Sequence, residues 1–237
     1  LAQEDGLRTV YEATLKKWID VTIKNGVPQN NWNLHQAKFI LKVAMVLEDN
    51  AGYADGKGRE YYINYILNQT STRQWSLLRF MEYGYDNNNG IWHECPGYAT
   101  GVTKDLMNFI RDYDNTFNQN LLPYTPVMKK AVTVLPQYLF PNKQTTAFGD
   151  SYYGSLNTEA MSDMIRLAQK YGNREDEVTF TRLYRLFSPE TRGKESGGRN
   201  TVDRIADNGK NETSGNDRRK NDAKKNDVVI KMPPQVS

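Results

Sequence analysis

The chain has 237 residues, of which 38% are hydrophobic and 25% are charged, and its formal net charge is +3. One core can grow to roughly 250–300 residues, so this length suits one large domain, or one domain and a tail. Residues 194–237 hold ten Lys/Arg and seven Asp/Glu, a net +3 that equals the value for the whole chain. The rest of the chain is therefore close to neutral, which excludes a basic nucleic-acid-binding domain.

The cysteine count and the apolar runs exclude further classes. Cys95 is the one cysteine of the sequence, so no intrachain disulfide forms, and it lies in no zinc-binding spacing. No apolar run approaches the roughly 20 residues that a membrane helix needs. Residues 1–5 have neither the basic nor the apolar part of a signal peptide, so we expect any signal peptide to have been removed or never to have existed.

Helical patterns follow one another along the chain. Apolar residues at three- and four-residue steps predict a helix over 7–23, which Gly26 and Pro28 end. The segment 34–47 is too densely apolar for one face and predicts a buried core helix. Similar segments, with breaks rich in Gly, Asn, Asp and Pro, predict helices at 57–68, 72–82, 98–113, 125–139, 158–171 and 174–187.

Several residues predict where these helices begin and end. Pro123 and Pro126 mark the beginning of the helix at 125–139, and Pro136 should end or kink it. Asn157 or Thr158 suits the start of the following helix. No segment has the alternation of a β-strand.

The expected fold class is all-α. Short loops leave consecutive helices as antiparallel neighbours, which favours paired helices in an incomplete α/α toroid over residues 1–190, although an α-solenoid is also compatible. Residues 191–237 have too few apolar side chains to bury, so we expect a polar, charged linker or a disordered tail there.

Two loops, 83–97 and 141–156, are longer and richer in aromatic and polar groups than connectors require, and function tends to lie on such loops. The first ends in His93, Glu94 and Tyr98, three groups that can transfer protons. Tyr98 is expected to open the next helix, whose N-terminus favours a negatively charged phenolate and so helps tyrosine act as a base. In the alternative interpretation these side chains only pack under the loop or face solvent.

A second patch, Asn31, Trp32, Asn33 and His35, lies at the start of the buried helix. Asn31 or Asn33 could simply be its N-cap. Alternatively, an amide together with His35 binds a carboxylate or a sugar hydroxyl. The chain has two histidines, and they lie in these two patches.

A third patch, Asp150, Tyr152 and Tyr153 in the second loop, suits stacking on sugar rings and hydrogen bonding to them, or else seals the edge of the core. Glu94 and Asp150 could also form the acid/base pair of an inverting glycosidase, which needs carboxyl groups roughly 6.5–9.5 Å apart.

The stretch Gly-Ile-Trp-His-Glu-Cys-Pro-Gly-Tyr-Ala (90–99) carries a family resemblance. Together with Asn31-Trp32-Asn33 upstream, and with Leu139-Phe140-Pro141-Asn142 and Phe148-Gly149-Asp150-Ser151 downstream, it resembles the heparinase II/III-like polysaccharide lyases over about residues 7–187. The resemblance implies an incomplete α/α toroid followed by a β-sandwich domain. That domain, which in the family adds a histidine to the cleft, is absent from this chain and is expected C-terminal to it.

The resemblance also implies an activity: β-elimination on an anionic, uronic-acid polysaccharide of the glycosaminoglycan or alginate type, without a metal or organic cofactor. Tyr98 matches the family's proton-transfer tyrosine. Asn31, Asn33 or His35 would neutralise the substrate carboxylate, a task that His93 could share, and Glu94 would orient its neighbour or bind a hydroxyl group. We expect substrate contacts from Trp32, Trp92, Asp150, Tyr152 and Tyr153.

The same resemblance implies a periplasmic or secreted bacterial enzyme. Two other hypotheses remain beside the lyase: a toroidal glycoside hydrolase that uses Glu94 and Asp150, and a non-catalytic glycan-binding fragment.

Overall fold

A computed structural model of the chain describes residues 2–188, with side chains from residue 6 onward. The expected tail at 191–237 lies outside the described residues. The described part contains the helices α1 (Ala2–Lys24), α2 (Asn31–Ala44), α3 (Arg59–Asn68), α4 (Leu77–Gly84), α5 (Pro96–Phe117), α6 (Val127–Val134), α7 (Glu159–Lys170) and α8 (Arg174–Phe187).

Within residues 2–188 there is no β-strand, only isolated β-bridges, so the predicted all-α class is confirmed. Every predicted helix is present. The predicted proline effects are also confirmed: α6 begins directly after Pro126 and ends at Val134, where the chain tightens into a short 3-10 helix with Pro136 near its start. None of the described helices is long and apolar enough to cross a membrane.

The described residues divide into two compact units. The first unit contains residues 2–87 and 112–127, and the second contains residues 88–111 and 128–188. The sequence predicts one toroid over 1–190, and closure of the helices into a toroid stays a prediction.

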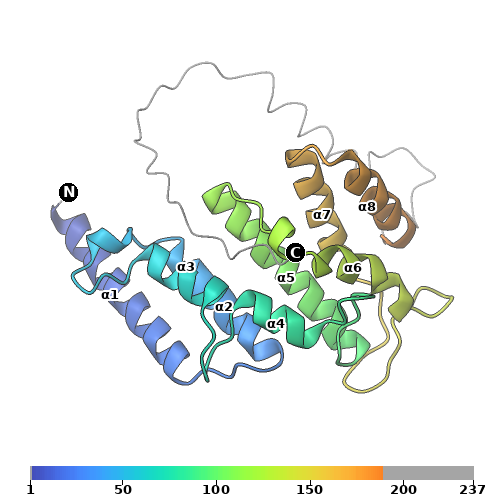
Figure 1. Cartoon of the computed structure of the whole chain (residues 1–237), viewed down its shortest axis with the longest axis horizontal. Coiled ribbons are helices and arrows are strands. Elements are labelled where there is room, and N and C mark those ends of the chain that lie inside the picture. The colour runs from blue at the N-terminus through green and yellow to red at the C-terminus, as the bar shows by residue number, and fades with distance from the viewer. Residues whose placement is uncertain (1, 189–237) are drawn as a thin grey trace, which may run out of the picture. The chain divides into compact units, whose positions relative to one another are not determined.

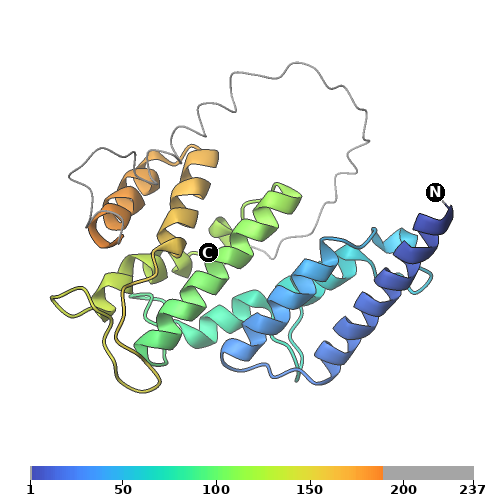
Figure 2. The ribbon, with the colours of Figure 1, turned by 180° about the vertical axis from the view of Figure 1, so that it is seen from behind.

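In the first unit, α2 packs against α1 and α3, and α4 packs against α2 and α3; Figures 1 and 2 show α1, α2 and α3 side by side. Helix α2 is buried along most of its length, as its dense apolar pattern predicts. Its N-cap is Asn30, whose Oδ1 accepts a hydrogen bond of 3.0 Å from the Trp32 backbone N–H. The expectation that Asn31 or Asn33 caps the helix is therefore wrong, because both lie inside its first turn.

In the second unit, α7 and α8 form an antiparallel hairpin, which both views show. The N-cap of α8 is Asn173, whose side chain accepts a hydrogen bond from the Asp176 backbone. Helix α7 is joined to α5 by an ion pair in which the partly exposed Arg111 lies 3.1 Å from the buried Asp163. This unit carries the second of the long loops singled out from the sequence and, from residue 88 onward, the first.

Candidate functional site

The first long loop is fixed to α6 by Gly90. Its φ is +77°, a backbone conformation that side chains other than glycine rarely adopt. A Cβ atom at this position would lie 2.4 Å from the backbone N of Ala131 and from the carbonyl carbon of Lys130. The loop backbone therefore lies directly against α6, and only glycine allows that approach.

Trp92 then holds His93 in place. The indole is 1% exposed, and its Nε1–H donates a hydrogen bond of 2.8 Å to the Glu94 carboxylate. The Trp92 backbone N–H donates to the hydroxyl of Tyr138 at 3.3 Å. The exposed imidazole of His93 stacks on the indole, with ring centroids 4.7 Å apart. The expected sugar contact of Trp92 is contradicted by this burial, because a buried indole has no surface left for a sugar ring.

The junction between this loop and α5 is built around the Cys95 sulfur. Burial raises the pKa of the Cys95 thiol, but hydrogen bonds from the Ser151 hydroxyl and from backbone N–H groups, including that of Tyr98, lower it below its ordinary value. The Ser151 hydroxyl also accepts a hydrogen bond of 2.6 Å from the Gly97 backbone N–H. Cys95 and Ser151 thus supply partners for the first backbone N–H groups of α5, where an N-cap side chain usually acts.

Tyr98 is the third residue of α5 and is partly exposed. It was expected to open this helix, and it lies in the first turn, after Pro96 and Gly97. Its backbone is held by Cys95, and the neighbouring loop segment is held by the Trp92 contacts described above. The structure therefore brings Tyr98, His93 and Glu94 to one well-anchored segment of the second unit.

The segment 139–156, which contains the second long loop and which we call the aromatic arm, has an ordered base. Thr145 donates a hydrogen bond of 2.8 Å from Oγ1 to the Tyr152 carbonyl, and its backbone N–H donates to the Gly154 carbonyl at the same distance. Near the tip, Gly149 has a φ of +61°, and a Cβ there would lie 3.0 Å from that of Cys95. The arm is therefore closed at its base and also touches the junction at Cys95.

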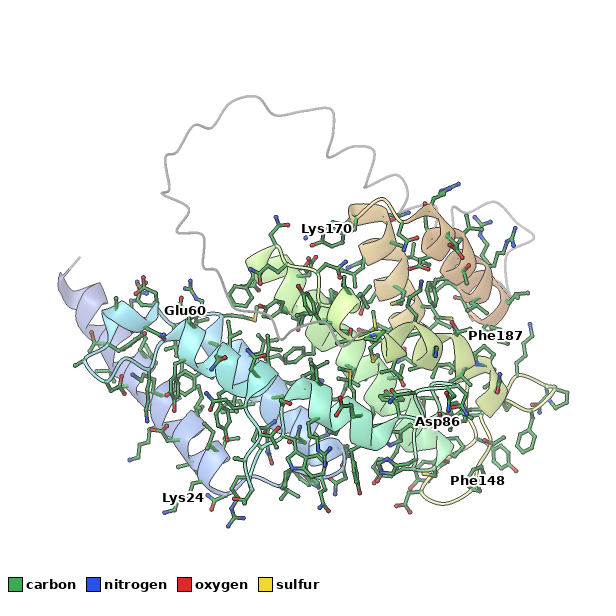
Figure 3. All side chains as sticks on the ribbon, in the orientation of Figure 1. Lys24, Glu60, Asp86, Phe148, Lys170 and Phe187 are labelled. Carbon is green, nitrogen blue, oxygen red and sulfur yellow. The ribbon has the colours of Figure 1, made fainter. Side chains whose placement is uncertain are left out.

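The arm exposes a group of aromatic rings. Tyr152 is 86% exposed and Tyr153 70% exposed, and Asp150, whose backbone bonds to Cys95, is exposed too. The rings of Tyr153 and Phe140 are stacked, with centroids 6.0 Å apart. Phe148, labelled in Figure 3, is a further exposed ring. The interpretation that these tyrosines seal the core does not fit such exposure, whereas rings open to solvent can stack on sugars.

The patch at the start of α2 lies in the first unit, and Asn33 has a structural role there. Its side chain is 1% exposed. Its Nδ2 donates to the Trp75 carbonyl at 3.2 Å, and its Oδ1 accepts from the Trp75 backbone N–H at 2.8 Å. Asn33 therefore fastens α2 to the segment before α4, and the burial contradicts its expected contact with a substrate carboxylate.

The other members of this patch reach the surface. Trp32 is 59% exposed, His35 is exposed, and Asn31 is partly exposed. The rings of Trp32 and His35 meet edge to face, with centroids 6.1 Å apart. Unlike Asn33, these three side chains are open to a ligand.

The residues that hold the loops, chiefly Ser151, Tyr138 and Thr145, were not predicted from the sequence. Ser151 and Tyr138 bond to backbone groups 54 and 46 residues away, which no local pattern predicts, whereas Thr145 bonds to two carbonyl groups within its own loop. Gly149 was the one available signal, because a glycine in a loop often has a positive φ. Among the described residues, no group of three or more His, Cys, Asp and Glu side chains is placed to hold a metal ion.

Comparison with known families gives one finding that bears on this site. Residues 88–211, just over half of the chain, match the family model described as the second domain of an endo-acting ulvan lyase. The match begins within the loop that carries Trp92, continues through Tyr98 of α5 and includes the whole aromatic arm. It leaves out the patch at Asn31 to His35. Comparisons with curated proteins and with solved structures gave no match.

Proposed function

We propose that this chain, which belongs to the family of the second domain of endo-acting ulvan lyases, forms part of a polysaccharide lyase that cleaves a uronic-acid polysaccharide by β-elimination. The observation that carries the proposal is the extent of the match, which spans both loops of the second unit. The family is one of polysaccharide lyases, so the lyase part of the predicted resemblance is confirmed. Membership of the heparinase II/III-like family stays a prediction.

The chemistry requires three tasks. The substrate carboxylate must be neutralised so that the neighbouring C5 proton becomes more acidic, a base must remove that proton, and an acid must protonate the departing C4 oxygen. The electron pair left by the C5 proton forms the C4–C5 double bond as the C4–O bond breaks. No water is added, so the product is an unsaturated uronate.

Tyr98 is our candidate for the proton carrier. It lies on a fixed segment, because Cys95 and Ser151 hold the first turn of α5 and Gly90 holds the other end of the loop. A catalytic group gains most when its position is set before the substrate binds. The partly exposed phenol has access to a substrate that lies over the loop.

His93 is our candidate for the carboxylate-binding group in this unit. The imidazole is exposed and lies flat on Trp92, so its plane is set while its ring nitrogens stay near the surface. Glu94 then acts through Trp92, by fixing the indole on which His93 stacks. It is therefore a positioning residue in this proposal.

The aromatic arm would bind the sugar rings around the bond that breaks. Tyr152 and Tyr153 offer exposed faces for stacking, and Asp150 can accept hydrogen bonds from sugar hydroxyl groups. Asn31, Trp32 and His35 of the first unit keep their predicted role as further ligands of the substrate. The family match does not cover them, so single Asn31→Ala and His35→Ala variants test that role.

The test uses the whole chain and ulvan as the substrate. Absorbance near the ultraviolet edge follows the unsaturated uronate, and we expect Tyr98→Phe to abolish its formation. Tyr171→Phe is the matched control, because Tyr171 is an exposed tyrosine of the same unit that lies at the end of α7, away from both loops.

Three results would overturn the proposal. Full turnover by Tyr98→Phe would exclude Tyr98 as the proton carrier. Release of reducing sugar without the unsaturated product identifies a glycoside hydrolase. Binding of ulvan that never leads to a product, even when a β-sandwich domain found C-terminal to this chain is present, identifies a glycan-binding module.

A further inference from the structure

A group of aromatic and basic side chains lies in the first unit, where α4 begins. Arg79 of α4 is exposed, and its guanidinium group lies over the indole ring of Trp75, 5.4 Å from the ring centroid. The ring of Tyr83 meets the same indole edge to face, with centroids 5.0 Å apart. The indole is therefore supported on one side and sets the place of the guanidinium group on the other.

The guanidinium group of Arg79 can still bind an anion. Within residues 2–188 its side chain makes no hydrogen bond and no ion pair, and this includes the exposed Glu82, three residues further along α4. Stacking occupies the flat face of a guanidinium group and leaves the N–H groups at its edge. These N–H groups match the two oxygens of a carboxylate or a sulfate ester.

Amide side chains fix the segment that carries Trp75 against the start of α2. Asn33 bonds to both backbone groups of Trp75, as described above. Gln74 is 1% exposed, and its Nε2 donates a hydrogen bond of 3.2 Å to the Asn33 carbonyl. Its Oε1 accepts a hydrogen bond of 2.6 Å from Nε2 of Gln36. These bonds hold the two segments in one arrangement, so the group at Trp75 is built on a fixed base.

The exposed ring of Trp32 belongs to the same part of the first unit. Trp32 directly precedes Asn33, so Trp32 and Trp75 lie on adjoining segments. Helix α2 has no acidic residue, and Arg73, two residues before Trp75, is exposed and makes no side-chain ion pair within the described residues. An exposed indole beside a positioned guanidinium group suits a charged sugar, whose carbon face can stack while its acidic group binds the cation.

We propose that Arg79, held on Trp75 and with Trp32 beside it, forms a binding site for an anionic sugar residue of the polysaccharide. The guanidinium group binds a carboxylate or a sulfate ester through two parallel hydrogen bonds, and the indole of Trp32 stacks on the sugar ring. Tyr83 is a positioning residue that acts through Trp75. The inference rests on the proposed function for its class of ligand, and it adds charge recognition outside the residues that the family match covers.

The test measures binding without turnover and uses the indole N–H groups as reporters. The sequence has four tryptophans, of which two lie at the proposed site, one in the candidate catalytic loop and one on the exposed side of α1: Trp32 and Trp75, Trp92, and Trp18. The isotope-labelled whole chain is titrated with glucuronate, with glucose 6-sulfate and with neutral glucose. We expect the Trp32 and Trp75 resonances to shift with at least one anion and not with glucose, while Trp18 stays unchanged. The responding anion identifies the chemistry recognised.

Substitutions then locate the charge that binds. Arg79→Gln should weaken the binding about tenfold, which is the loss of one charge-assisted hydrogen bond. Arg79→Lys keeps the charge without the planar group and should bind more weakly than the original chain but more tightly than Arg79→Gln. Lys17→Gln, which removes an exposed lysine of α1 in the same unit, should not change the binding. Unchanged Trp18 and Trp92 resonances in each variant check that the fold is kept.

The proposal fails if neither anion shifts the Trp32 and Trp75 resonances, if glucose shifts them equally, or if Arg79→Gln binds as tightly as the original chain. These outcomes are independent of lyase activity. Turnover of ulvan without any anion response at Trp32 and Trp75 would retain the proposed function and exclude this site. Anion binding there by a chain that forms no unsaturated product would do the reverse.

Discussion

The indole Nε1 of Trp92 donates a hydrogen bond of 2.8 Å to the carboxylate of Glu94, two residues further along the chain. The indole is buried, and the exposed ring of His93 lies on it. An acidic residue beside a histidine and a tyrosine suggests a proton donor at first sight. In this structure the carboxylate accepts the indole hydrogen bond, and in our proposal its task is to position the indole on which His93 stacks.

Glu94→Gln and Glu94→Ala separate these two roles. The glutamine keeps an oxygen that can accept the indole hydrogen bond, so we expect turnover within a few-fold of the original chain. The alanine removes this acceptor from a buried donor, which should cost about 1–3 kcal/mol of stability and displace His93. Urea unfolding and the ultraviolet assay measure the two effects. Loss of all turnover in Glu94→Gln, with stability unchanged, would instead identify Glu94 as an acid or base.

Gly90→Ala should damage the site through the backbone. The added methyl group would meet the α6 backbone at 2.4 Å, and the φ of +77° is itself unfavourable for alanine. We expect a lower melting temperature and a large fall in turnover. Gly101→Ala is the control, because a Cβ there meets nothing within 4 Å and alanine favours the helix. Equal melting temperatures for the two variants would show that the loop tolerates displacement.

Asn33→Ala should destabilise the first unit. The side chain makes two hydrogen bonds to the Trp75 backbone in a buried setting, and their loss leaves buried peptide groups without these partners, at a cost of about 2–3 kcal/mol. Asn31→Ala, two residues earlier in the chain and partly exposed, should change the stability by less than about 0.5 kcal/mol. Unfolding in urea compares the two, and similar losses would argue against the structural role of Asn33.

The stability of the second unit should depend on pH through Asp163. Burial raises the pKa of its carboxyl group from 3.8 to about 6, against the opposing effects of Arg111 and Arg166. The folded chain therefore holds this proton more tightly than the unfolded chain does. The resulting contribution to the free energy of unfolding is fully present below pH 3.8 and is lost as the pH rises through about 6.

Asp163→Asn tests this dependence, because the amide has no proton to lose. The stability of the original chain relative to the variant should fall between pH 4 and pH 7, which urea unfolding at a series of pH values measures. Parallel pH profiles for the two proteins would mean that the Arg111 ion pair fully offsets the burial of the carboxylate.

The helices were predictable because each depends on local signals. The three- and four-residue steps of 7–23 led to α1, and Pro136 ended α6 where it was expected to. The N-cap of α2 was misassigned because Asn30, Asn31 and Asn33 are chemically equivalent caps in sequence. Asn30 takes the role because its backbone, with a φ of +61°, lies outside the helix. Residue propensities do not distinguish this position from those of Asn31 and Asn33.

The site was predictable only in part. A cluster of His93, Glu94 and Tyr98 is visible in the sequence, but its support is not, because Ser151 and Tyr138 approach from segments about fifty residues away. Burial separated the remaining candidates: it left Tyr152 exposed and buried Trp92 and Asn33. Such a distinction depends on tertiary packing, since an aromatic or amide side chain of a given type suits either environment.

The sulfur of Cys95 offers a practical route to observing this site in solution. It is the one thiol of the 237-residue sequence, it is partly accessible, and it touches both the first turn of α5 and the tip of the aromatic arm. A small fluorinated reagent would therefore attach at one known position without any engineered cysteine. The fluorine resonance of the attached group would change when a glycan binds to the arm. The rate at which the thiol reacts would show how often the arm separates from helix α5.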